Sequence, residues 1–377
     1  MMAEQNVVVL KPVYYDDFKC IADQCTYSCC QDWNIEIEEA VYAKYQMLPA
    51  ISPDCFYRQG SSVYIQNRQD GRCPFLNENG LCSLILQYDE TILSRTCTLF
   101  PRTYVKRADG IEASISNSCP ALLEMLLKLP APLSFVLEED LVPEVVYGCC
   151  EEEWIPVRDQ MIDLIQIRGV PLWKRLFASY QFANKIETDG EHREHYVKNY
   201  TDPNYLNALF QMLDTMTLPL EPRLQLLSRL FLHINGKSQH YLGYKRYIQA
   251  LLTTAESPDW DTWIAQWGKL REILNEYHAF FENFCVNNIF RDGAVRREQY
   301  GLLHKSIAVI LEVAMIDFTL FLYWLHKGQP LTEKEVIEIA CYYARIIEHN
   351  SKNFYEFITE LRNEGLLSEA DLLLLLG

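Results

Sequence analysis

The cysteines of this chain are gathered near one end, and no other feature constrains its fold as strongly. Nine of the thirteen cysteines lie in the first third of the 377 residues. Most of these nine stand beside turn or loop residues, whereas cysteines that only fill a core occur more often inside periodic apolar segments. We therefore expect the first third to be organised around its thiols and the rest of the chain to be organised differently.

The start of the chain bears on the state of those thiols. It reads Met-Met-Ala-Glu-Gln-Asn before a short apolar run, without the basic region and long apolar region of a secretion signal. We therefore expect a cytoplasmic protein, and in that compartment thiols stay reduced. An odd number of cysteines also makes a set of structural disulfides the weaker explanation.

The spacing of the cysteines narrows the choice of metal. The first group is Cys20-x4-Cys25-x3-Cys29-Cys30, and all eight histidines lie beyond residue 190. Soft thiolates without histidine favour zinc, copper(I) or iron–sulfur centres. A zinc site normally shows tandem pairs of closely spaced cysteines and needs only four ligands. The surplus of thiols therefore favours iron–sulfur over zinc.

The first group of cysteines allows one further prediction and excludes one known pattern. If its segment is helical, Cys25 and Cys29 lie on one face at i and i+4 and converge on one centre. The radical S-adenosylmethionine pattern Cys-x3-Cys-x2-Cys begins correctly there, but its third position is occupied by Asp32. That pattern is therefore not present.

Turn signals surround two of the later cysteines. Ser62 to Gln66 alternates like a strand, and the dipeptides Asp70-Gly71 and Asn79-Gly80 that follow favour tight turns. Cys73 and Cys82 each come two residues after one of these glycines. Backbone N–H groups in such turns are free to point at the sulfurs of a cluster. The isolated or paired cysteines Cys55, Cys149, Cys150, Cys285 and Cys341 are expected to be packing residues.

Prolines mark the boundary between the two parts. Pro130, Pro132, Pro143 and Pro156 prevent a long helix through this stretch. We therefore expect a cysteine-rich domain at 1–125, a connection at 126–160 and a helical domain at 161–377. The fold class is α+β and predominantly α, with the small N-terminal α+β domain packed on a larger all-α domain.

Apolar periodicity predicts helices along most of the second part. Thr332 and Glu335 have the spacing of a capping box, and Gly365 suits a helix end. The apolar stretch 307–325 contains Glu312 and Asp317, each costly at a bilayer centre, so it is expected to be a buried helix and not a membrane span. The predicted helices cover 161–186 with a restart at Pro171, 202–216, 221–235, 259–283, 303–327, 333–349 and 352–364.

The charge of the chain restricts its partners. Its formal net charge is -17, and it has no block of five or six like charges. A nucleic-acid partner bound through a basic stripe is therefore disfavoured, and a lysine-bearing protein suits the acidity better.

The cysteine motifs resemble those of a known family. They are Phe18-x-Cys20, Cys25-x3-Cys29-Cys30-x2-Trp33, Cys73-Pro-Phe-Leu, Gly80-x-Cys82, Leu93-Ser94-x2-Cys97-x2-Phe100-Pro101-Arg102 and Ser118-Cys119-Pro120. Together they resemble the flagellin lysine N-methylases and, more distantly, the small zinc- or iron-chelating cysteine-cluster proteins. The motifs cover about residues 18 to 120, and beyond them only Pro171-Leu172-Trp173-x-Arg175-Leu176 is similar to the family.

The resemblance implies a cytoplasmic bacterial enzyme of the flagellum that transfers a methyl group from S-adenosylmethionine to lysines of flagellin. It also implies a [4Fe-4S] cluster, while no nucleic acid or membrane partner is expected. Trp33 is a candidate to shield the cluster, and Arg102 is a candidate to pair with its charge or with a substrate carboxylate. The candidate metal ligands are Cys20, Cys25, Cys29, Cys30, Cys73, Cys82, Cys97 and Cys119.

Some questions stay open at the level of the sequence. No glycine-rich nucleotide loop is present, so S-adenosylmethionine is expected to bind in another way, for example through an iron with an open coordination position. His192 and His195 are flanked by charged residues, so we expect them to lie on the solvated surface and not to form a metal-binding pair. The alternative function is a non-enzymatic metal-binding or cluster-carrier module, and an electron-transfer protein is a third possibility.

Overall fold

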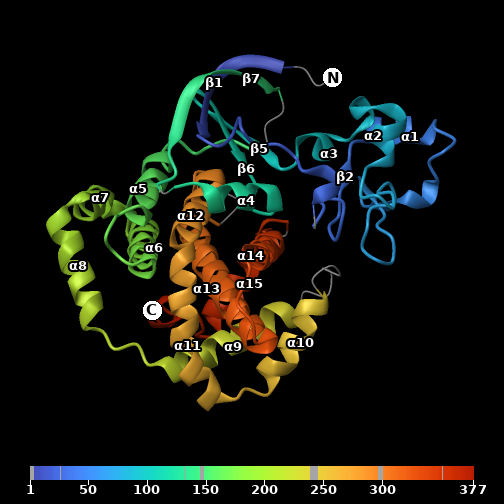
Figure 1. The fold of residues 1–377 in the computed structure, drawn as a ribbon. Helices are drawn as coiled ribbons and strands as arrows, with labels where there is room; N and C mark the ends of the chain where they lie inside the picture. Colours follow the sequence, from blue (N-terminus) through green and yellow to red (C-terminus); the bar gives the residue numbers. More distant parts are fainter. Residues whose placement is uncertain are drawn as a thin grey trace.

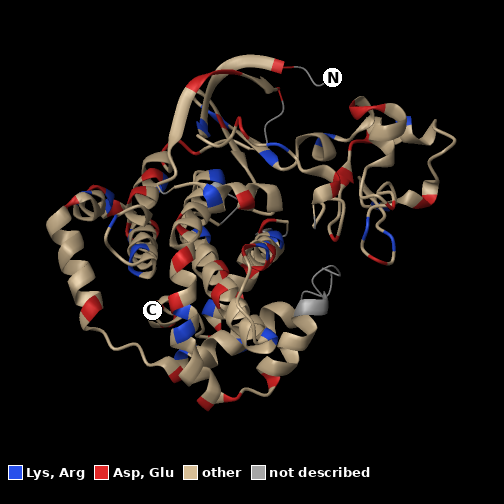
Figure 2. Ribbon diagram, viewed as in Figure 1, with Lys and Arg blue, Asp and Glu red and all other residues tan. Residues whose placement is uncertain are grey.

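The computed structural model is predominantly helical with a smaller strand-containing region, which confirms the α+β class expected from the sequence. It describes residues 4–25, 27–130, 132–144, 148–237, 245–295, 300–349 and 351–377. Figure 1 shows three parts: a sheet, a separate lobe beside it, and a large group of helices beneath both. Charged residues of both signs are spread over all three parts (Figure 2).

The larger sheet joins the two ends of the N-terminal region. It consists of β1 (Glu4–Pro12), β5 (Arg102–Arg107), β6 (Gly110–Ile115) and β7 (Phe135–Pro143) in the order β5-β6-β1-β7. Strand β1 is parallel to β6 and antiparallel to β7, and it pairs with β7 along its full length. The proline-containing connection therefore carries a strand, because β7 lies within it. At Gly110 a Cβ atom would collide with the Val8 carbonyl oxygen, so the approach of β6 to β1 requires glycine there.

The second part is a small lobe, residues 29–97, which we call the cysteine lobe. It contains the sheet β2-β4-β3, formed by Glu36–Ile37, Ser62–Ile65 and Phe56–Gln59, and the short helices α1 (Glu39–Gln46), α2 (Ser83–Tyr88) and α3 (Arg95–Leu99). Its apolar core is separate from that of the rest of the protein. The predicted strand and both predicted turns are confirmed, since β4 covers Ser62–Ile65 and Gly71 and Gly80 have φ of 81° and 77°.

The helical part begins with α4, which lies under the sheet. Most predicted helices are confirmed, but 259–283 is two helices, because a 3-10 turn at Asn275–Tyr277 separates α11 from α12. The capping box of Thr332 and Glu335 is present, and Gly365 follows α15 with φ of 77°. The helices are α4 (Pro120–Lys128), α5 (Ile155–Ile165), α6 (Leu172–Thr188), α7 (Arg193–Thr201), α8 (Pro203–Thr215), α9 (Leu220–Lys237), α10 (Lys245–Glu256), α11 (Trp260–Leu274), α12 (His278–Asp292), α13 (Leu302–Lys327), α14 (Glu333–Glu348), α15 (Ser351–Asn363) and α16 (Glu369–Leu376).

Helix α13 runs through the middle of this part. By length and composition it is the one described helix that is apolar enough to cross a membrane, but 94% of its apolar window is buried inside the protein. Both of its acidic residues are buried, and Asp317 accepts from Arg271 at 2.7 Å. The prediction of a buried core helix is therefore confirmed.

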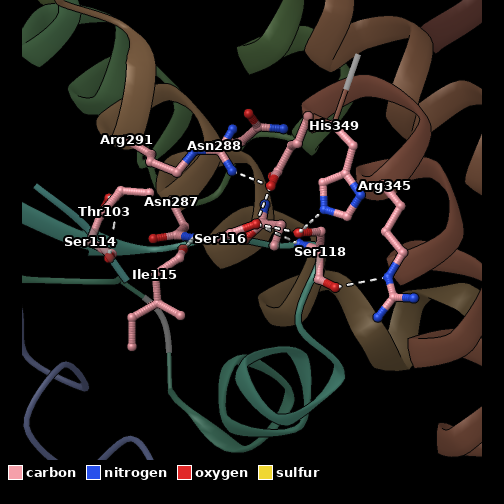
Figure 3. Close-up of polar contacts among 12 residues, drawn as sticks. Thr103, Ser114, Ile115, Ser116, Ser118, Asn287, Asn288, Arg291, Arg345 and His349 are labelled. Carbon is pink, nitrogen blue, oxygen red and sulfur yellow. Dashed lines mark hydrogen bonds and ion pairs between the residues drawn. The ribbon is translucent and has the colours of Figure 1, made fainter. Parts of the chain in front are cut away.

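The sheet and the helices share one large apolar core, and a polar seam runs along their contact. Asn287 on α12 donates to the Ile115 carbonyl at 2.9 Å, and Asn117 donates to the Phe284 carbonyl at 3.0 Å. Figure 3 shows this seam continuing through Ser116 and Ser118 to helix α14. These side-chain amides pair with strand-end and helix carbonyls, and buried carbonyls require such partners.

Candidate functional site

Four thiols of the cysteine lobe form one neighbourhood, and we call them the lobe thiols: Cys30, Cys73, Cys82 and Cys97. They come from four separate segments. The Cys73 amide donates to the Cys30 carbonyl at 2.8 Å. After the second glycine turn, Cys82 pairs with Leu76 in an isolated antiparallel β-bridge. Cys97 lies in α3, whose first turn is fixed by Ser94 accepting from the Cys97 amide at 3.2 Å.

The pKa shifts of the lobe thiols indicate that Cys73, Cys82 and Cys97 each lie near Cys30. Burial raises the pKa of Cys73, Cys82 and Cys97, and the charge of Cys30 raises each of them further. For Cys97 the pKa reaches about 12. Thiols with a raised pKa are protonated near pH 7, and a metal centre binds them in the thiolate form.

Cys29 and Cys30 form a linked pair. A hydrogen bond between the two thiols raises the pKa of Cys29 and lowers that of Cys30. The segment that carries them is not helical after Cys25, which is extended with ψ of 114°. The condition under which Cys25 and Cys29 would share a helix face is therefore not met, because residues 27–30 are not helical.

A second set of thiols lies where the lobe, the sheet and the helices meet. We call Cys20, Cys25, Cys119 and Cys341 the junction thiols. Cys119 and Cys341 are buried, Cys25 is half-buried, and Cys20 is exposed. The charges of Cys20 and Cys341 act on Cys25, and those of Cys341 and Cys25 act on Cys119. The eight candidate ligands are thus divided between two neighbourhoods, with Cys29 beside the lobe thiols.

Neither set is arranged around a single ion. Within the described ranges, no three His, Cys, Asp or Glu side chains lie close enough together to hold one metal ion. The remaining cysteines are apart from both sets: Cys285 is buried in α12, and Cys150 donates to Glu112 at 3.4 Å.

Arg345 on α14 connects the two sets of thiols. Its Nε donates to the Ser118 carbonyl at 3.1 Å, its Nη1 to the Ser28 carbonyl at 3.4 Å, and its Nη2 to the Tyr27 carbonyl. The guanidinium is buried, and its charge acts to lower the pKa of Cys25, Cys29 and Cys30.

Trp33 and His349 form a second contact between the cysteine lobe and the end of α14. Their rings are stacked with centroids 4.5 Å apart, and the Trp33 Nε1 donates to the Cys29 carbonyl. His349 Nε2 lies 3.2 Å from the Ser118 Oγ (Figure 3). Burial lowers the pKa of His349 well below its usual value, and Arg345 and Arg291 lower it further, so the ring is neutral near pH 7.

Trp33 and His349 line a cleft of about 770 Å³ between the cysteine lobe and the helical part. This volume falls within the range of small-molecule sites. One wall comes from the lobe at Asp32 to Asn34 and Gln66 to Arg68, and the other comes from α9, α14 and α15. The helical wall carries Phe354 and a stacked pair, His233 and Phe357, while Glu356 and Glu360 are exposed at its edge.

Arg102 lies elsewhere. Its Nη2 donates to the Phe18 carbonyl at 3.1 Å, and its guanidinium lies over the rings of Tyr15 and Phe18. It is not among the residues that line the cleft. In this structure Arg102 fixes the segment that leads to Cys20. His192 and His195 are exposed, as expected of surface residues.

The sequence interpretation missed the contribution of α14. Cys341, Arg345 and His349 recur every four residues and therefore lie on one face of the helix. Each contacts the N-terminal cysteine region, through Ser118 in all three cases. The available signal was this polar stripe with a cysteine and a histidine in an otherwise apolar segment.

Comparison with known proteins matches the second part of the chain to a protein family. The family described as "FliB lysine N-methylase C-terminal domain" matches residues 158–375. The flagellar biosynthetic protein FliU of Salmonella muenchen is 25% identical over 140 residues, which cover 33% of this chain and 80% of FliU.

Two further relatives carry the name lysine-N-methylase, from Salmonella choleraesuis and Salmonella typhimurium. Each is 25% identical over 136 residues, and the match spans about a third, 34%, of each relative's length. No solved structure matches the chain. Because the family match covers more than half of the sequence, this chain belongs to the FliB lysine N-methylase C-terminal domain family.

Proposed function

We propose that this protein is a cytoplasmic protein-lysine N-methyltransferase that uses S-adenosylmethionine, acts on flagellin and holds a [4Fe-4S] cluster through its N-terminal cysteines. Family membership supports the methyl transfer and a flagellar substrate. The observation that carries the proposal is the cleft, because its two walls are the cysteine lobe and the methylase domain.

The donor set suits an iron–sulfur cluster better than a single ion. Cys30, Cys73, Cys82 and Cys97 bring four soft sulfurs from four segments into one neighbourhood that is partly buried. A cluster binds each thiolate through a different iron, so its ligands stand farther apart than those around one ion. This requirement agrees with the absence of a close three-residue metal group in the described ranges. When bound, such a cluster fixes the four segments and offers iron as a Lewis acid.

The cleft suits a lysine side chain. The apolar stem of lysine packs along aromatic rings, and a cation is favoured over their faces. Trp33, Phe354 and Phe357 supply such rings, while Glu356 and Glu360 attract the cation at the entrance. Removal of the ammonium from water lowers its pKa, and methyl transfer requires the neutral amine. The cleft therefore binds and orients the substrate lysine.

The first test is anaerobic purification with iron and sulfide analysis, followed by transfer of labelled methyl groups from S-adenosylmethionine to purified flagellin. We expect bound iron and sulfide, and label on lysine. A colourless zinc protein that transfers no methyl group, even after anaerobic reconstitution with iron, would instead support the metal-binding module.

A matched pair of variants tests the cleft itself. The double substitution Glu356→Gln and Glu360→Gln removes two exposed charges and is expected to raise KM for flagellin about fivefold with little change in kcat. The control is Glu191→Gln with Glu194→Gln, an equally exposed pair away from the cleft. Equal KM values for the two double variants would exclude this entrance as the lysine site.

A further inference from the structure

Helix α14 belongs to the matched methylase domain, yet one of its faces lies against the N-terminal cysteine region. Cys341 Sγ donates to the Ser118 carbonyl at 3.2 Å, and His349 bonds to the Ser118 hydroxyl. Arg345 stands between them, one turn from each. The methylase domain thus approaches the cysteine region through a polar stripe.

Arg345 makes the most extensive of these contacts. Its three donors reach carbonyls on two separate segments, Tyr27 and Ser28 on one and Ser118 on the other. Ser28 directly precedes the Cys29–Cys30 pair, and Ser118 directly precedes Cys119. The side chain is 1% exposed, so this guanidinium ties two cysteine-bearing segments to α14 from inside the protein.

From this geometry we infer that Arg345, a residue of the methylase domain, is a positioning residue for the N-terminal cysteine centre, holding the Tyr27–Ser28 and Ser118 segments in place and opposing the centre's negative charge. The inference rests on the proposed cluster. It means that the cysteine region depends on α14 to complete its site.

The chemistry of arginine fits this role. The planar guanidinium has five donors in a fixed fork and remains charged, whereas lysine offers one compact ammonium. Burial of a charge is costly unless it is hydrogen-bonded and electrostatically opposed. Thiolate-bound clusters are negatively charged, and their potentials respond to nearby charge and hydrogen bonding. A buried guanidinium beside them is therefore an electrostatic partner as well as a clamp.

The chain supplies a matched control in Arg223. This arginine on α9 is 5% exposed and donates from Nη2 to the carbonyls of Leu375 and Leu376 at 3.1 and 3.3 Å. It is thus also a buried arginine bound to backbone carbonyls, but its partners lie on α16, away from every candidate ligand.

The test compares Arg345→Met and Arg345→Lys with Arg223→Met and Arg223→Lys in the full-length protein. We expect Arg345→Met to weaken iron retention about 10- to 100-fold, the usual loss when an outer partner of a metal site is removed. Its reduction potential should become more negative, because a positive charge is lost. Arg345→Lys keeps the charge, so it should retain iron poorly while its potential stays close to that of the unmodified protein.

Both Arg223 variants should lower the unfolding temperature without changing the iron per folded chain or the potential. The inference is overturned if the Arg345 and Arg223 variants have the same iron content and the same potential. An unmodified protein that binds no iron would contradict the cluster itself. In that case the rate at which the native thiols react with Ellman's reagent tests whether Arg345 holds the cysteine segments in place. The thiols of Arg345→Met should react several-fold faster than those of Arg223→Met, and equal rates would refute this positioning role.

Discussion

The cysteine lobe and the helical part are stabilised in different ways. The described core of the lobe contains ten buried residues, one of them Cys73, and its strands are two to four residues long. The helical part packs against the sheet around a far larger core that surrounds α13. Small cores seldom stabilise a fold unless disulfides, metals or neighbouring elements assist. We therefore expect the lobe to depend on its thiols and its neighbours, whereas the helices depend on apolar packing.

The largest expected effect breaks the lobe and spares the helices. Cys73→Ser removes one lobe thiol, and we expect it to lose nearly all bound iron and methyl transfer, a loss above the 10- to 100-fold of an outer partner. Limited proteolysis should then cut within 29–97 first. The control is Cys285→Ala, a buried cysteine in α12 that should keep its iron. Equal iron in the two variants would show that the lobe needs no metal.

A substitution in the core of the helical part is expected to affect the helices alone. Phe318 is fully buried on α13, with ring contacts to Phe231 and Trp263. We expect Phe318→Ala to lower the free energy of unfolding by about 3–5 kcal/mol, as for large-to-small changes in cores. Urea unfolding followed by helix circular dichroism measures the loss. The iron bound per folded chain should not change, and a parallel fall in iron would mean that the two parts do not have separate sources of stability.

A smaller effect comes from a buried carboxyl in α13. Burial, and next the charge of Glu348, raises the pKa of Glu312 from 4.5 to about 8, although Lys305, Arg291 and Asn288 oppose the shift. The folded protein thus binds a proton here that the unfolded chain releases above pH 4.5. This contribution to stability is complete below about 4.5 and is lost as the pH rises through about 8.

The check is urea unfolding at several pH values for the unmodified protein and for Glu312→Gln. Stability should fall more steeply with rising pH in the unmodified protein, because the amide cannot ionise. Iron content should be unaffected over the same range if this carboxyl serves only the helices. Parallel pH profiles for the two proteins would mean that Glu312 is already ionised in the folded state.

Local features were predicted well because their causes are local. The turns at Gly71 and Gly80 require positive φ, and the helix cap at Thr332 requires only its own neighbour Glu335. The buried helix α13 follows from a long apolar run interrupted by acids. The gathering of cysteines predicted a cysteine-rich domain at 1–125, and the cysteine lobe lies within this range.

Features that depend on distant contacts were not predicted. Strand β7 lies in the proline-containing connection, and it exists because β1 offers its edge. Cys25 and Cys29 have the spacing of one helix face, but residues 27–30 are not helical. Arg345, from the far end of the chain, donates to the Tyr27 and Ser28 carbonyls. Whether Trp33 and Arg102 bind a cofactor remains a prediction, although only Trp33 lies on the cleft.

The sequence by itself therefore determined the types of element, the family-like cysteine motifs and the likeness to flagellin lysine N-methylases, because propensity, turn chemistry and motif spacing act over a few residues. Tertiary structure alone decided how the thiols divide into lobe and junction sets, and that Trp33 meets His349 at a cleft. It also brought Arg345 to the cysteine segments. These arrangements depend on the packing of α14 against segments more than 200 residues away in the sequence. A local sequence pattern carries no information about contacts between residues so far apart.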